Sequence, residues 1–75
     1  VGHDDLEPLK RLSARELDVL RGVALGRSLK EIAAELKLSE KTIATYRARL
    51  GEKLGLSSNV DLTRFALLHK LIDPG

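Results

Sequence analysis

The sequence of 75 residues contains no cysteine, tryptophan or methionine, and its only aromatic residues of the Phe, Tyr and Trp class are Tyr46 and Phe65. Because cysteine is absent, disulfide bonds, thiolate metal sites and a cysteine nucleophile are excluded. No apolar run reaches the roughly 18 to 20 residues that span a bilayer, and the first residues lack a signal-peptide hydrophobic stretch. These absences predict a cytoplasmic chain that packed aliphatic side chains hold together.

Hydrophobic residues make up 43% of the sequence and charged residues 32%, which is typical of a soluble globular domain. A chain this short has room for one hydrophobic core and not for two. The chain begins at Val1, and we interpret it as a fragment of a longer protein. We expect residues 1–11 to form a linker or lead-in segment and residues 12–73 to form the domain.

Basic residues are unevenly distributed along the chain. The net charge is only +2, from 13 basic and 11 acidic residues. Residues 1–39 and 55–75 are each neutral, so the whole excess falls within residues 40–54, which contain Lys41, Arg47, Arg49 and Lys53 against Glu40 and Glu52. Such a cluster is compatible with a nucleic-acid-binding surface and also with an ordinary solvated helical face.

Serine residues mark the start of successive helices. Ser13 to Glu16 and Ser28 to Glu31 both follow the capping-box pattern, in which serine and glutamate satisfy each other's backbone amides. Ser39 is a third N-cap, and residues 57–59 offer caps for a fourth helix. The apolar spacing then predicts helices over residues 14–25, 29–37, 40–54 and 59–70. With no alternating β-branched run, the predicted fold class is all-α.

Only Leu38 and Ser39 separate the second and third expected helices. A corner this tight does not suit an antiparallel hairpin, but it suits the steep crossing of a helix-turn-helix. In that motif the second helix lies in the DNA major groove and the first crosses the phosphate backbone.

The helix over residues 40–54 has two distinct faces. Ile43, Leu50 and Leu54 share one side and are expected to be buried. The opposite side then carries Lys41, Thr45, Ala48 and Glu52, flanked by Ala44, Thr42 and Arg49. Small side chains allow a helix to enter a groove about 12 Å wide, with Lys41 and Arg49 reaching bases or phosphates from its rim. The alternative is a plain exposed helical face.

Three motifs together resemble a known family: residues 12–16 (LSARE), 36–43 (LKLSEKTI) and 52–56 (EKLGL). They resemble the LuxR-type helix-turn-helix of NarL/FixJ response regulators, over residues 12–73, and the stretch 41–50 looks closest to the GacA/UvrY or BvgA type. The resemblance implies the C-terminal effector domain of a two-component transcription factor, with a phosphorylated receiver domain upstream. It also implies base contacts by Lys41, Ala44, Thr45 and Ala48, and phosphate contacts by Lys30, Thr42 and Lys53. Ala44 departs from the lysine frequent in the family, so the DNA sequence that is bound does not follow from the resemblance.

The helix over residues 59–70 is expected to pack Leu62, Phe65, Ala66 and His69 inward. A second stripe, Val60, Arg64, Leu67 and Leu71, would face outward and is interpreted as a homodimer interface that presents two recognition helices to inverted-repeat half-sites of double-stranded DNA. Other interpretations are an edge contact with the N-terminal segment, a surface covered by the receiver, and a helical protein–protein interaction module unrelated to DNA.

An enzyme is not expected. His3 and His69 are far apart in sequence, and the chain has no glycine-rich phosphate loop. We therefore expect no catalytic residue, cofactor or metal. Region four of a sigma factor shares the Ser-x-x-Glu start, but the Lys53-Leu54-Gly55 ending and the fourth helix favour the LuxR type.

Overall fold

The structure is a computed structural model that describes residues 10–72. Within these residues the chain forms α2 (Ala14–Ala24), α3 (Leu29–Leu36), α4 (Glu40–Leu54) and α5 (Asn59–Leu68), and no strand. The predicted all-α class is therefore confirmed, and every helix boundary agrees with its predicted position within two residues. Of the expected lead-in over residues 1–11, all but the last two residues lie outside the described part of the chain, as does the end of the expected domain beyond Ile72.

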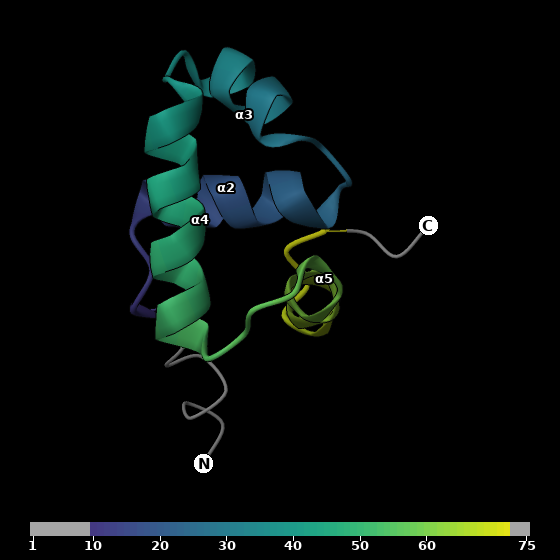
Figure 1. The fold of residues 1–75 in the computed structure, drawn as a ribbon. Coiled ribbons are helices and arrows are strands. Elements are labelled where there is room, and N and C mark those ends of the chain that lie inside the picture. Colours follow the sequence, from purple (N-terminus) through teal and green to yellow (C-terminus); the bar gives the residue numbers. More distant parts are fainter. Residues whose placement is uncertain (1–9, 73–75) are drawn as a thin grey trace.

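Helix α2 is central to the fold. It packs against α3, α4 and α5, and α3 also packs against α4. Figure 1 shows α4 crossing in front of α2 at a steep angle, α3 near the first turn of α4, and α5 viewed end-on beside the last turns of α2. Among residues 10–72, no helix has both the length and the hydropathy needed to cross a lipid bilayer.

Each of the four helices begins at a serine. The hydroxyls of Ser13, Ser28, Ser39 and Ser58 accept hydrogen bonds from backbone amides three residues later, at 3.1 to 3.2 Å. Both predicted capping boxes are complete, since the carboxylates of Glu16 and Glu31 accept from the amides of Ser13 and Ser28 at 2.8 Å. Local sequence therefore fixes where every described helix starts.

The helix ends are equally regular. Gly26, Lys37, Gly55 and Lys70 all adopt left-handed backbone conformations. After each of them, the next amide donates back across the last turn, for example from Leu38 to the carbonyl of Ala33 at 2.9 Å. This is the Schellman arrangement, which satisfies carbonyls that a helix end leaves open. Lysine occupies two of the four left-handed positions, where glycine carries no steric penalty.

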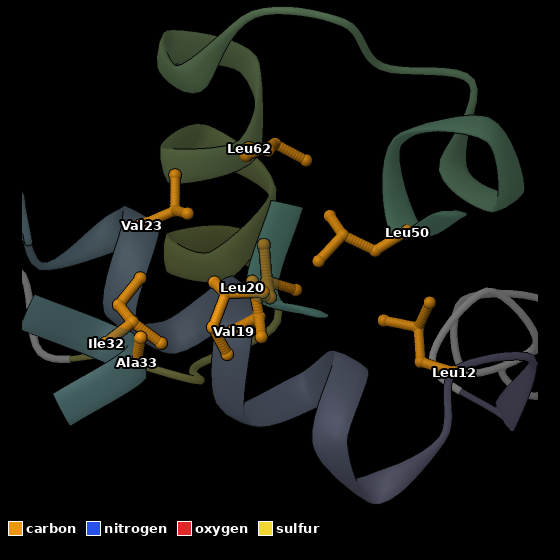
Figure 2. Packing of buried hydrophobic residues seen from close by; sticks show 9 residues of the cluster. Leu12, Val19, Leu20, Val23, Ile32, Ala33, Leu50 and Leu62 are labelled. Carbon is orange, nitrogen blue, oxygen red and sulfur yellow. The ribbon is translucent and has the colours of Figure 1, made fainter. Parts of the chain in front are cut away.

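The core lies where α2, α4 and α5 meet, and α3 closes one side (Figure 2). Its largest fully buried side chains are Val19, Leu20, Ile32, Ile43, Leu50 and Leu62. Gly22 brings α2 and α3 close together, because a Cβ atom there would lie 2.6 Å from Cγ1 of Ile32. This packing holds α3 and α4 as a fixed pair on α2.

Candidate functional site

The corner between α3 and α4 sets the direction of α4. Lys37 ends α3 in a left-handed conformation with φ of 59°. Leu38 follows and packs partly buried against the core, and Ser39 caps α4 through a 3.1 Å bond from the Thr42 amide. With one residue between the end cap of α3 and the start cap of α4, the chain turns sharply, as a helix-turn-helix requires.

Helix α4 has the two faces that the sequence predicts. Ile43 and Leu50 are completely buried. The exposed residues on the other side are Lys41, Ala44, Thr45, Ala48, Arg49 and Glu52. Thr42 is half-buried at the edge of this face, with its Oγ1 atom 2.9 Å from Oγ of Ser39. The exposure of this face is confirmed, and we call it the α4 face below.

The four bases of α4 divide into two pairs. None of the ion pairs found within residues 10–72 includes Lys41 or Arg49. Arg47 turns instead toward the loop before α5 and donates to the Ser57 carbonyl at 2.9 Å and to Oδ1 of Asn59 at 3.0 and 3.2 Å. Arg47 therefore holds α4 to the loop before α5, and Lys53 also bonds within the chain.

Lys53 belongs to that internal pair. Its Nζ atom lies 2.7 Å from Oε1 of Glu16 and donates to the Arg11 carbonyl at 3.1 Å. Glu16 is only 2% exposed, so it is a buried carboxylate on α2. Burial raises the pKa of Glu16, but hydrogen bonds from Lys53 and the Ser13 amide, with the Lys53 charge, outweigh burial and bring the pKa below its ordinary value. Lys53 thus ties the last turn of α4 to the first turn of α2, and the ammonium group expected at a phosphate is already held there.

Lys30, which the resemblance predicts to contact phosphate, lies at the exposed start of α3. Lys30 is in the first turn of α3 and faces solvent, beside the partly buried Leu29. The structure therefore distributes the predicted DNA contacts over the first turn of α3 and the exposed side of α4, while Lys53 lies at the far end of α4.

Helix α5 requires one correction. Leu62 and Ala66 are buried and Phe65 and His69 partly so, as predicted, with the Phe65 and His69 rings 4.2 Å apart. The placement of Leu71 on the outward stripe was wrong. The helix ends at Leu68, and the left-handed Lys70 turns the chain back, so the Leu71 amide donates to the Ala66 carbonyl at 2.8 Å and its side chain packs on the core.

The outward side of α5 is nevertheless apolar. Val60 is 62% exposed, Leu67 38% and Leu68 79%, and Arg64 lies exposed among them. Leu68, which the sequence interpretation overlooked, is the most exposed large hydrophobic residue in the described part of the chain. Its spacing of eight residues from Val60 was the available signal, because positions eight apart share a helical face.

Sequence reasoning also overlooked the burial of Glu16 and the contacts that Arg47 makes within the chain. Glu16 lies at helical spacing from Leu12, Leu20 and Val23, which are all buried, so its place on the buried stripe was readable. Arg47 lies four residues after Ile43 and three before Leu50, so its place beside the buried side of α4 was also readable, but its partners Ser57 and Asn59 were not.

Comparison with known proteins agrees with this architecture. The model of the bacterial regulatory proteins of the luxR family matches residues 10–66. The chain belongs to the luxR family. Similar proteins include the Fimbriae Z protein of Salmonella typhimurium, 48% identical over 71 residues that cover 95% of this chain and 32% of that protein. The oxygen regulatory protein NreC of Staphylococcus aureus is 42% identical over 67 residues, which cover 89% of this chain and 31% of that protein.

This membership confirms the family predicted from the sequence motifs, a helix-turn-helix family of DNA-binding transcription regulators and not of enzymes. The finer resemblance to the GacA/UvrY or BvgA type stays a prediction. This luxR-family chain spans about a third of the length of the relatives named above. No solved structure matches it.

Proposed function

We infer that this luxR-family domain binds double-stranded DNA in a sequence-specific manner by placing α4 in the major groove, as the effector domain of a two-component response regulator. In this arrangement Lys41, Ala44, Thr45 and Ala48 face base edges, and Arg49 reaches from the rim. Lys30 and the Thr42 end of α4 meet phosphates. The proposal places a receiver domain upstream of this domain in the full-length protein.

One observation carries the proposal: the α4 face is exposed while the opposite side of the same helix is buried in the core. Ala44, Thr45 and Ala48 at the centre of this face have short side chains, so a groove can approach the helix backbone closely there. Lys41 and Arg49, which form no ion pair with any other residue in 10–72, lie on either side of the short residues. The first turn of α4 adds the positive end of a helix dipole, which favours a phosphate beside Thr42.

Lys53 has a different role in this proposal from the one that the resemblance implies. Its ammonium group already bonds to Glu16 and Arg11, and giving these up would leave a buried carboxylate without its cation. We assign Lys53 to the positioning of α4. A phosphate contact through its remaining proton is compatible with this role.

A homodimer is the proposed DNA-bound state. On the outward side of α5, Val60, Leu67 and Leu68 form an apolar stripe around Arg64. Two copies of the chain can bury this stripe against each other. Two domains joined in this way would offer two α4 helices to the half-sites of an inverted repeat. Its apolar character also suits the alternative of a protein–protein interaction module.

Fluorescence anisotropy with short duplexes over a salt series tests the DNA proposal. Neutralised phosphates release counterions, so affinity must fall steeply as salt rises, and the Lys30→Ala variant must reduce that slope by about one. The Lys41→Ala variant must instead change the preferred sequence. Lys70→Asn is the matched control, because asparagine tolerates the left-handed backbone while the charge is removed far from α4. Absence of salt-dependent binding would leave the interaction module as the better interpretation.

The dimer is tested separately. The Leu68→Glu variant should fold normally, because this side chain is 79% exposed, and should bind a two-half-site duplex more weakly than the unmodified chain. Binding to a single half-site should not change. If Leu68→Glu binds both duplexes as the unmodified chain does, α5 is not the interface.

A further inference from the structure

We propose that α4 recognises its site mainly through the 5-methyl groups of thymine, and that Thr45 contributes the central contact. This inference rests on the proposed function, since it specifies what the α4 face reads once the helix lies in the groove. It concerns the class of base sequence that is bound, which family membership alone leaves open.

The hydroxyl group of Thr45 is already engaged. Its Oγ1 atom donates to the Lys41 carbonyl at 3.1 Å, and a hydroxyl has a single proton. Thr45 therefore has no proton to donate to N7 or O6 of a purine. What remains for a base edge is its γ-methyl group and the acceptor lone pairs of Oγ1, which can pair only with an amino group of adenine or cytosine, on a residue that is exposed at the middle of the α4 face.

The neighbours of Thr45 have the same chemistry. Ala44 and Ala48 are exposed one residue before and three residues after it, and each offers a methyl group. The centre of the face thus carries no amide, carboxylate or guanidinium group that could pair with a base in bidentate fashion. The charged side chains of the face, Lys41, Arg49 and Glu52, flank this centre.

Thymine is the base that this surface fits. In the major groove it is distinguished by its C5-methyl group, which contacts alanine and the threonine methyl, whereas guanine, adenine and cytosine are read through hydrogen bonds. We therefore expect half-sites with A·T pairs at the centre of the contact with α4. Any guanine read by hydrogen bonding should lie toward one end, within reach of Lys41 or Arg49.

The test uses the 75-residue chain and the duplex that it enriches most strongly from a random pool. Each thymine of that duplex is replaced in turn by deoxyuridine, which keeps the base pair and removes only the methyl group. At least one replacement per half-site should weaken binding about fourfold. This is the fold-change expected for the loss of one buried methyl group, when a tenfold change in affinity corresponds to about 1.4 kcal/mol. Replacements outside the half-sites are the control and should have no effect.

Two variants, one isosteric and one that lacks the methyl group, assign the contact to Thr45. Thr45→Val keeps a methyl group and removes the hydroxyl, and it should bind within about twofold of the unmodified chain and keep the deoxyuridine effect. Thr45→Ser keeps the hydroxyl and removes the methyl; it should bind about fourfold more weakly and lose the deoxyuridine effect at one position. Position 45 is exposed, so circular dichroism should show that both variants keep the fold of the unmodified chain.

Several results would overturn the inference while leaving the proposed function intact. They are sequence-specific, salt-dependent binding with no thymine that responds to deoxyuridine, and a Thr45→Val variant that loses affinity while Thr45→Ser does not. If every deoxyuridine replacement weakens the binding of Thr45→Ser as much as it weakens the binding of the unmodified chain, Thr45 does not contact a thymine methyl group. Failure to bind any duplex would instead overturn the proposed function itself.

Discussion

The buried carboxylate of Glu16 should contribute measurably to stability, and the Glu16→Gln variant isolates that contribution. Oε1 of Glu16 accepts from Nζ of Lys53 at 2.7 Å and from the Ser13 amide at 2.8 Å. Glutamine keeps an oxygen there but loses the negative charge. The Ser13 bond becomes a neutral one, which lowers its contribution from about 1.5 to 3 kcal/mol to about 0.5 to 1.5 kcal/mol. The Lys53 bond keeps its charged donor and loses only the attraction of the ion pair, so the two bonds together should lose about 1 to 2 kcal/mol.

The pH dependence of this loss has a definite sign. The pKa of Glu16 in the folded chain is below its ordinary value of 4.5, so the folded state binds fewer protons than the unfolded state in that range. The stabilisation is therefore complete above pH 4.5 and disappears as the pH falls through the folded pKa. Glu16→Gln has no proton to gain at this position. The stability gap between the two proteins should thus narrow in acid.

Urea unfolding followed by circular dichroism at 222 nm measures this gap at neutral and acidic pH. For a domain of this size the upper end of the expected loss, about 2 kcal/mol, corresponds to a melting temperature lower by about 10 °C. Glu31→Gln is the matched control, because Glu31 forms the same capping box on an exposed helix without a lysine partner, and it should lose less stability than Glu16→Gln. A gap under about 0.5 kcal/mol at pH 7, or one that stays constant into acid, would refute a stabilising role for the buried charge.

Three further variants test the turns around α4. Gly51→Ala should destabilise the domain by about 1 to 2 kcal/mol, because its Cβ atom would lie 2.8 Å from the Leu56 carbonyl oxygen; unchanged urea stability would mean that the corner relaxes freely. Lys37→Gly should stabilise by about 0.5 kcal/mol by relieving the left-handed backbone, and lower thermal stability would contradict this. Arg47→Met should lower the free energy of unfolding by about 1 kcal/mol and speed the hydrogen exchange of backbone amides after Gly55. The salt slope of DNA binding should not change, and a lower slope would make Arg47 a phosphate contact.

Helix positions were predictable from sequence because their signals are local. Each described helix starts at a serine whose hydroxyl bonds three residues ahead, and this pattern is visible in the sequence itself. The exposed side of α4 was predictable for a related reason, since Ile43 and Leu50 fix the direction of the buried side. The end of α5 was harder to predict, because glycine is typical of a left-handed turn and lysine, which occupies position 70, is not.

Roles that depend on partners distant in sequence were not predictable in this way. Lys53 and Glu16 are 37 residues apart, and Arg47 meets Asn59 across a loop. From composition, all four bases of α4 looked equally available to DNA. Only the packing of α4 across α2 and the fold of the loop before α5 separate the two that hold the helix from the two that face outward.

This division of the bases sets how strongly one domain can bind. With Arg47 and Lys53 holding the last turns of α4 to the loop before α5 and to α2, the proposed contacts leave Lys30, Lys41 and Arg49 as the cations of one copy. Even when each of these three cations is counted as neutralising a phosphate, the salt slope of one copy is at most about 3, whereas two copies on an inverted repeat give at most about 5 to 6. A single domain with so few charges and a methyl-rich reading surface would bind weakly, so tight binding at physiological salt requires the second copy. The apolar outer side of α5 then matters as much for affinity as the α4 face does for sequence preference, and a slope near 3 on a duplex with both half-sites would show that the copies bind without pairing.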